Sequence, residues 1–172
     1  MATNRRRLSS PHDNGHGPGR RSCLAIGLCL TTTALMMSSV LSAQSALGDT
    51  GDGLRAAVEA TRGTSCGELT SNPVVDEAAR AINATTDKWI DNASRAVPET
   101  DALTVLKDLG YAASKATILS GAAADDGDAI KALLLQGYAK IPDCSYKDFG
   151  VSALHNAKKD LTLTTVVLVV PA

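Results

Sequence analysis

The sequence predicts an α+β fold, in which about three helices pack on a small antiparallel sheet that ends in a C-terminal β-hairpin. Two observations carry this prediction. Segments with apolar residues at helical spacing fill the middle of the chain, between residues 73 and 141. The C-terminal residues 148–172 instead hold two β-type segments separated by a short polar loop. Helices that precede a terminal hairpin are typical of the α+β class.

The first predicted helix covers residues 73–92, PVVDEAARAINATTDKWIDN. Asn72 can cap it, and Pro73 suits the first helical position because no backbone N–H is needed there. Asp76 and Glu77 lie near the positive end of the helix dipole, which they stabilise. Apolar residues recur at helical spacing from Val75 onward and give the helix one mostly apolar face.

Two shorter helices follow by the same reasoning. One lies within residues 100–110 and is stopped by Gly110. The other lies within ADDGDAIKALLLQGYAKIP, where Asp125 or Asp126 caps its start and Pro142 ends it. The acidic run at its start lacks the alternating ligand pattern of a calcium loop, so we interpret it as a helix cap.

Strands are predicted on both sides of the last helix. The segment SKATILSG, residues 114–121, is short and apolar. FGVSALH alternates, with Phe149, Val151, Ala153 and His155 on one face, and LTLTTVVLVV is rich in β-branched residues. The polar residues NAKKD, 156–160, form the loop of a hairpin between these last two strands.

Composition excludes one class of function. Only 3% of the residues are aromatic, and the chain from residue 44 onward carries 12 basic and 17 acidic residues. A nucleic-acid-binding domain needs a basic surface, commonly with aromatic side chains that stack on bases. We therefore expect no nucleic-acid partner.

The N-terminal part of the chain has the organisation of an export signal. Residues 1–21 are basic and polar and are interpreted as a disordered cytoplasmic tail. Residues 22–45 form an uncharged stretch with small residues at its end, typical of a signal peptide cleaved after Ala43 or Ser45. The same stretch is long enough for an uncleaved signal anchor. The protein is therefore expected outside the cell or in the envelope, and any contact with the membrane runs through this segment.

The remaining chain divides into two predicted parts. Residues 46–65 are rich in Gly, Ser and Thr and are interpreted as a linker with one short helical stretch. Residues 66–172 are predicted to form the folded domain.

Two cysteines remain beyond the leader, Cys66 and Cys144. In an exported protein an even number of cysteines predicts disulfide bonding, and two cysteines allow one connectivity. The alternative is that Cys144 is a free nucleophilic thiolate, which would make the protein a secreted hydrolase using Cys144 or His155.

No complete catalytic, cofactor or metal site is evident. His155 is the only histidine beyond the leader, and no spacing rule joins it to an acidic partner. The nucleophile pattern G-x-S-x-G, the P-loop and the dinucleotide-binding glycine pattern are all missing from the sequence. We therefore expect no catalytic residues, no cofactor and no metal.

The second half of the chain resembles a known family. Residues 109–156, LGYAASKATILSGAAADDGDAIKALLLQGYAKIPDCSYKDFGVSALHN, are similar to the CAP superfamily of cysteine-rich secretory, antigen 5 and pathogenesis-related 1 proteins. The similarity is greatest to its small exported members of the type found in actinobacteria. The run FGVS falls where the family has a GVG strand. The resemblance implies an α-β-α sandwich, secretion, and the binding of a ligand such as a lipid or of a protein partner.

The departures from the family pattern concern its cation-linked site, which two histidines and two acidic residues usually line. Where a Glu-Asn pair is expected, this chain has Thr117, Ile118 and Leu119. Where a histidine is expected at the end of a helix, it has Gln136, Gly137 and Tyr138. The sequence therefore predicts a secreted, non-enzymatic CAP-like domain without the family's metal site. A structural envelope protein tethered by an uncleaved leader is a further alternative.

Overall fold

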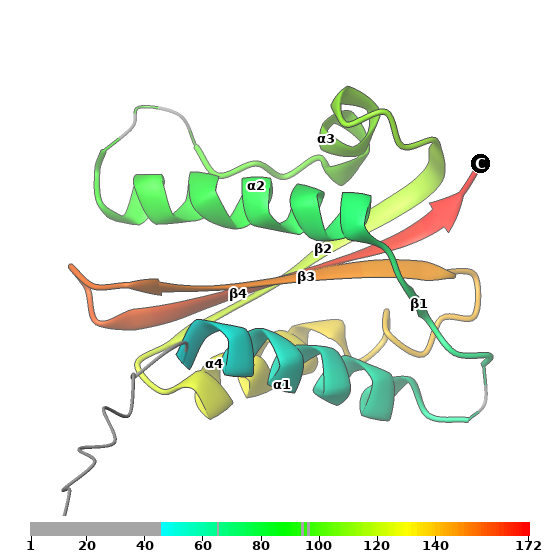
Figure 1. The fold of residues 1–172 in the computed structure, drawn as a ribbon, viewed down its shortest axis with the longest axis horizontal. Coiled ribbons are helices and arrows are strands. Elements are labelled where there is room, and N and C mark those ends of the chain that lie inside the picture. The colour runs from blue at the N-terminus through cyan, green and yellow to red at the C-terminus, as the bar shows by residue number, and fades with distance from the viewer. Residues whose placement is uncertain (1–45, 65, 94, 96) are drawn as a thin grey trace, which may run out of the picture. The chain divides into compact units, whose positions relative to one another are not determined.

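Two helices cover each face of a four-stranded sheet in this computed structural model, which describes residues 46–64, 66–93, 95 and 97–172 (Figure 1). In chain order the elements are α1 (Ala46–Arg62), β1 (Thr70–Ser71), α2 (Pro73–Ile90), α3 (Ala102–Asp108), β2 (Ala113–Ala123), α4 (Asp126–Gly137), β3 (Asp148–Asn156) and β4 (Leu161–Pro171). Helices α2 and α3 lie on one face and α1 and α4 on the other. The predicted α+β class and α-β-α layering are confirmed. The predicted leader lies outside the described residues.

Helix α1 corrects the prediction of a linker over residues 46–65. Leu54 and Val58 of this helix are fully buried, and both belong to a core cluster that includes Leu133 of α4 and Phe149 of β3. The glycines of this segment argued against a long helix in the sequence, because each Gly lowers helix stability by about 1 kcal/mol relative to Ala. Packing of the apolar face outweighs that penalty, as it does for most helices in proteins. The domain therefore has four helices and begins before residue 66.

The helix starts predicted from the sequence are confirmed. The side chain of Asn72 accepts a hydrogen bond from the Val74 N–H at 2.9 Å, and Pro73 is the first residue of α2. Asp101 caps α3, and Asp125 caps α4 by accepting from the Gly127 N–H at 2.8 Å. Gly110 follows α3 with a φ of 77°, the left-handed conformation that glycine adopts at little cost.

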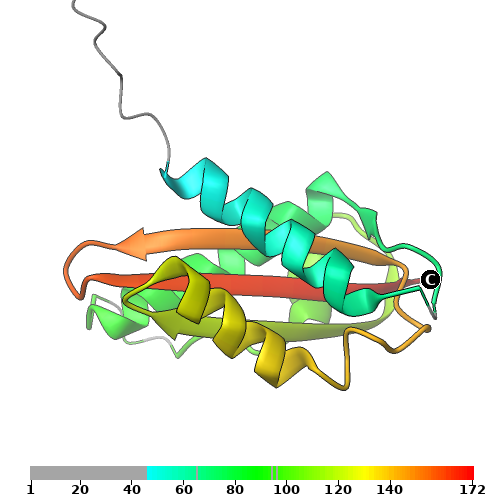
Figure 2. The same cartoon turned by 90° about the horizontal axis from the view of Figure 1, so that it is seen from below.

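The sheet has the order β1-β3-β4-β2. The hairpin predicted at the C-terminus is present as the antiparallel pair β3–β4, and β4 also pairs antiparallel with β2. The short strand β1 pairs parallel with the start of β3, so the sheet is mixed, with antiparallel pairing in its three longer strands. Strand β1 could not be predicted from the sequence, because a strand of two residues is too short to show an alternating pattern. Seen from below, α1 runs along the β3 side of the sheet and α4 along the β2 side (Figure 2).

One glycine decides how closely α2 approaches the sheet. A Cβ atom on Gly150 of β3 would collide with the carbonyl carbon of Val75 and the backbone nitrogen of Asp76. Backbone, unlike the far end of a flexible side chain, cannot move aside cheaply. Gly150 therefore sets the spacing at which the first turn of α2 packs on β3.

We expect the substitution Gly150→Ala to lower the free energy of unfolding by about 1–3 kcal/mol, the usual cost of overpacking. Urea unfolding of the purified protein measures this difference. Gly67→Ala is the matched control, because a Cβ at that position meets no atom within 4 Å. Equal effects of the two substitutions would show that the close approach at Gly150 is not a constraint.

Candidate functional site

The structure brings together the two segments at which the CAP pattern places its site residues. Leu119 lies in the middle of β2 and Gly137 at the end of α4, and a Cβ on Gly137 would stand 2.7 Å from the Leu119 Cδ1 and 2.9 Å from the Ile141 Cδ1. Leu119 is 2% exposed and Ile141 is fully buried. Closely packed hydrocarbon therefore fills the space between strand and helix end.

The polar residues nearest to this point do not converge on it. Tyr138 is 74% exposed at the C-terminus of α4. The amide oxygen of Gln136 accepts a hydrogen bond from the backbone N–H of Ser120 at 2.5 Å and so helps to cover the free edge of β2. Leu, Gly and Ile offer no side-chain atom that binds a metal. The residues present do not fit the family's divalent cation.

Within the described ranges no group of three or more His, Cys, Asp and Glu side chains is arranged to hold a metal ion. His155 lies near the end of β3, as predicted, with its Nε2 3.7 Å from the Oδ1 of Asp160 in the hairpin loop. The nearby Asp126 is held in the structure by hydroxyl groups. Hydrogen bonds from Thr162 and then Thr50 lower its pKa below the usual value.

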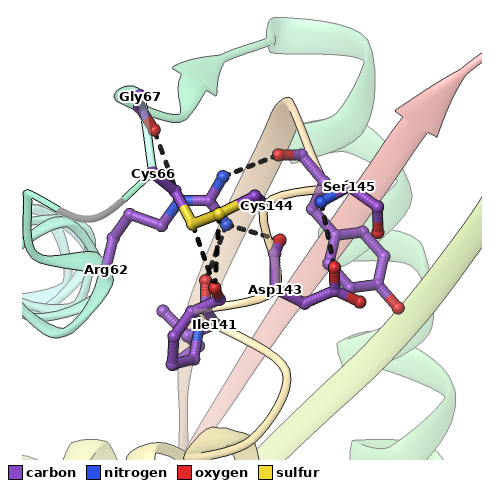
Figure 3. The surroundings of a disulfide bond; sticks show 9 residues. Arg62, Cys66, Gly67, Ile141, Asp143, Cys144 and Ser145 are labelled. Carbon is purple, nitrogen blue, oxygen red and sulfur yellow. Dashed lines mark hydrogen bonds between the residues drawn. A yellow bond between two sulfur atoms is a disulfide. The ribbon is translucent and has the colours of Figure 1, made fainter.

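The predicted disulfide between Cys66 and Cys144 is present, with a Cα–Cα distance of 5.1 Å (Figure 3). It joins the segment after α1 to the segment between α4 and β3. Cys144 therefore has no thiolate for catalysis. His155 is also remote from Cys144. Cys144 lies before the start of β3 at Asp148, and the seven residue steps from Asp148 to His155 span roughly 23 Å along the strand. The structure does not bring the two residues of the hydrolase alternative together.

Arg62 is the main residue of this region that sequence reasoning missed. Its side chain is 2% exposed, and its guanidinium donates to four backbone carbonyl groups. The acceptors are Gly67 at 3.3 Å, Ile141 at 2.7 Å, Asp143 at 2.7 Å and Tyr146 at 2.9 Å (Figure 3). Its position eight residues after Leu54, on the buried face of α1, is the only signal in the sequence that could have indicated it.

A second set of contacts fixes the segment that carries Cys144. The backbone N–H of Ser145 donates to Asp143, and the Lys115 ammonium lies 3.0 Å from the same carboxylate. These two interactions, the first being the larger, hold the pKa of Asp143 well below its usual range. The Lys115 ammonium also lies 4.4 Å from the centre of the Tyr146 ring. The segment is therefore held by charge as well as by the disulfide.

A cavity of about 660 Å³ lies beside the disulfide, between the end of α1 and the segment that follows it. Cys66 and Leu69 contribute buried surface, and the exposed Glu59 and Glu68 stand at its margin. Its volume is within the range of small-molecule sites, about 300–1,000 Å³. The disulfide and Arg62 fix the position of its wall.

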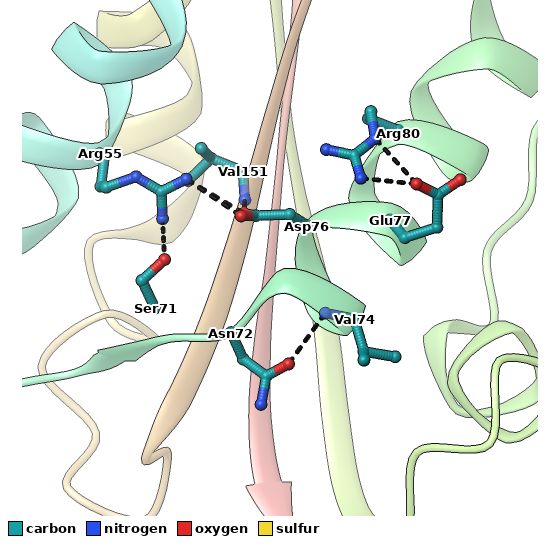
Figure 4. Close-up of polar contacts among 8 residues, drawn as sticks. All are labelled: Arg55, Ser71, Asn72, Val74, Asp76, Glu77, Arg80 and Val151. Atoms are coloured by element: carbon teal, nitrogen blue, oxygen red, sulfur yellow. Dashed lines mark hydrogen bonds and ion pairs between the residues drawn. The ribbon is translucent and has the colours of Figure 1, made fainter.

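The free edge of β3 is closed by an ion pair that connects the two helix layers (Figure 4). Asp76 of α2 accepts a hydrogen bond from the Val151 N–H at 2.7 Å. Arg55 of α1 reaches the same carboxylate at 3.2 Å, also donates to the Ser71 hydroxyl, and lies 5.5 Å from the centre of the Phe149 ring. These groups serve the structure, because each has its partner within the fold.

Tyr111 is the other strongly perturbed group. Burial, and then the hydrogen bond that its hydroxyl donates to Asp148, raise the pKa of Tyr111 to about 12. The phenol therefore stays protonated at neutral pH and acts as a hydrogen-bond donor that ties the start of β2 to the start of β3.

Comparison with known proteins identifies the fold. No protein-family model matches the chain, and no curated protein is similar to it in sequence. Solved structures are similar. A cysteine-rich secretory protein from Staphylococcus aureus superposes with a TM-score of 0.54 at 12% identity, over 74% of this chain and 40% of that one. An extracellular protein containing an SCP domain from Bacillus anthracis gives 0.51 at 14% identity, over 72% and 41%.

An outer surface protein from Borrelia burgdorferi gives a TM-score of 0.57 at 10% identity, over 73% of this chain and 94% of that one. This chain thus spans about two fifths of the staphylococcal and Bacillus proteins and nearly all of the Borrelia protein. The chain has the CAP fold, as the resemblance implied.

In the part of the chain that the structure describes, no helix is long and apolar enough to cross a membrane.

We expect Arg62→Met to lower the free energy of unfolding by about 2–4 kcal/mol, because it leaves buried carbonyl groups without a donor. Chemical denaturation measures the loss. Arg80→Met is the control, since Arg80 is 56% exposed and pairs only with Glu77 one turn away, so its removal should change stability by less than about 0.5 kcal/mol. A similar loss in both variants would contradict the role given to Arg62.

Tyr111→Phe should lower the free energy of unfolding by about 1–2 kcal/mol at pH 8, through loss of a hydrogen bond to a carboxylate. The pKa of Tyr111 is higher in the folded protein than its unfolded value of about 10. Its stabilisation is therefore fully present below pH 10 and is lost as the pH rises through 12. The difference between wild type and variant, measured by denaturation from pH 8 to 12, should shrink over that window. A constant difference would refute the assignment.

Proposed function

We propose that the protein is a non-enzymatic domain of the CAP fold that acts outside the cell or in the envelope by binding a ligand or a protein partner. The observation that carries this proposal is the apolar packing of Leu119, Gly137 and Ile141 at the place of the family's site. A catalytic or metal-dependent role would need polar side chains that converge there.

The solved structures of this fold support the location. They are described as secretory, extracellular and outer surface proteins. The N-terminal residues 1–45 of this chain have the order of an export signal. We propose that cleavage after Ala43 or Ser45 releases the domain. A leader that stays attached would instead tether it to the membrane, and N-terminal sequencing of the exported protein distinguishes the two.

The cavity beside the disulfide supports binding as the activity. It is walled by a segment held by the Cys66–Cys144 bond and by Arg62, so little conformational entropy is lost when a ligand enters. Native mass spectrometry of the exported protein reports a retained ligand, the disulfide and the cleavage position in one measurement.

We expect the purified protein to show no saturable binding of zinc in calorimetric titration, because His155 has Asp160 beside it but belongs to no group of three ligating side chains among the described residues. His155→Ala is the matched variant. Micromolar binding that disappears in His155→Ala would contradict the proposal and indicate a rebuilt metal site.

A further inference from the structure

A second cavity, of about 180 Å³, lies between α2 and the sheet. Asn83 and Thr86 of α2 form one wall, and Ser120 of β2 and Leu163 and Thr165 of β4 form the other. The cavity is separate from the disulfide region and from the place of the family's site. Its polar side chains have no role in the function proposed above.

Two of the lining residues, Ser120 and Thr165, form a row across the sheet together with Ser152 of β3. In the strand register Thr165 of β4 stands opposite Ser152 of β3 on one side and Ser120 of β2 on the other. Cross-strand partners place their side chains on the same face of a sheet. Ser152 accepts a hydrogen bond from Asn83, so this face is the one that α2 covers. The next β4 residues on that face, Val167 and Val169, are core residues, so the polar row interrupts an apolar surface.

Asn83 is 1% exposed, and its amide orientation is fixed by its partners. Its Nδ2 donates to the Leu163 carbonyl at 3.0 Å and to the Ser152 hydroxyl at 3.2 Å. Because a carbonyl only accepts, the nitrogen must point toward Leu163, and the Oδ1 points elsewhere. Among the described residues nothing donates to that oxygen.

Thr165 is likewise 1% exposed, and its hydroxyl makes no hydrogen bond to another described residue. Yet no fully buried side-chain nitrogen or oxygen in the described chain lacks a partner. The Asn83 oxygen and the Thr165 hydroxyl must therefore reach open space, and both residues line this cavity. The cavity holds one acceptor and one donor that the fold does not use.

The lining restricts the chemistry of an occupant. No charged side chain lines the cavity, so a charged ligand would be desolvated without a counter-charge. No aromatic ring lines it, which disfavours sugar rings and nucleobases that bind by stacking. Its volume corresponds to about six water molecules at about 30 Å³ each, so the occupant is small. A neutral carboxamide carries an N–H donor and a carbonyl acceptor on two atoms bonded to the same carbon, and these complement the Asn83 oxygen and the Thr165 hydroxyl.

We propose that this cavity is a binding site for a neutral carboxamide group, carried by a small free amide or by an Asn or Gln side chain of a peptide partner. Asn83 accepts the amide N–H, and Thr165 donates to the amide carbonyl. This inference goes beyond the proposed function, which rests on other residues and stands if the inference fails.

The test is a titration of the isotopically labelled, purified protein with acetamide, followed by NMR. We expect saturable shifts of the Asn83 side-chain NH₂ signals and of the Gly121 amide. Acetate, which has the same shape but a negative charge, should produce no saturable shift at these positions. Thr165→Val keeps the shape of the residue and removes its hydroxyl, so it should weaken acetamide binding about fivefold.

Thr117→Val is the matched control. Thr117 lies on the neighbouring strand β2 and stands opposite Leu168 of β4, a residue of the core cluster on the α1 and α4 side, so it faces away from the cavity. The Thr117→Val variant should bind acetamide with the same affinity as the wild-type protein. Tighter binding of the peptide Gly-Gly-Gln-Gly-Gly than of acetamide would identify a peptide side chain as the occupant, and equal or weaker binding would identify a free amide.

Three results would overturn the proposal. One is the lack of any saturable shift with acetamide, and another is an equal response to acetate. The third is equal affinity of the Thr165→Val and Thr117→Val variants. A crystal soaked in acetamide that contains only ordered water on Asn83 and Thr165 would also count against it.

Discussion

The buried guanidinium of Arg62 is the interaction on which the C-terminal half of the fold depends. It has no carboxylate partner among the described residues, and its charge is balanced by the carbonyl dipoles of Gly67, Ile141, Asp143 and Tyr146. Such a group is stable in the interior only when its donors are satisfied. The acceptors lie in the two segments that the disulfide also joins. The disulfide and the hydrogen bonds of Arg62 therefore hold the same two segments together, the one at the end of α1 and the one between α4 and β3.

The contacts that join α1 and α2 to the sheet lie further along β3. Gly150 lets the first turn of α2 lie directly on the strand, and Asp76 in that turn then reaches the Val151 N–H. Arg55 completes the link by joining α1 to the same carboxylate. An exposed strand edge can pair with other chains, and short edge strands and charged side chains are common protections. The two-residue strand β1 and this ion pair protect the β3 edge in that way.

The comparisons show that this chain shares the CAP fold, and the function proposed for it rests on its own side chains. At 10–14% identity the similarity to the solved structures concerns the arrangement of helices and strands. A fold does not by itself carry a function, which depends on particular side chains. Leu119 and Ile141 are core residues of this chain. Unused polar groups are found instead at Asn83 and Thr165, on the other face of the sheet, where α2 covers a row of hydroxyl groups.

The sequence by itself determined the helix start at Asn72 and the terminal hairpin, and it indicated the disulfide and narrowed the other helix starts to Thr100 or Asp101 and to Asp125 or Asp126. Caps, alternation and cysteine pairing are local or countable signals. It also located the departures from the family pattern. Only the tertiary structure decided that residues 46–62 are a packed helix and that Arg62 and Asn83 are buried with particular partners. Those outcomes depend on residues 80 or more positions away, such as Tyr146, 84 positions from Arg62, and Leu163, 80 positions from Asn83. Local propensity contains no information about partners at that distance, so burial and the polar contacts that it requires are settled only when the layers assemble.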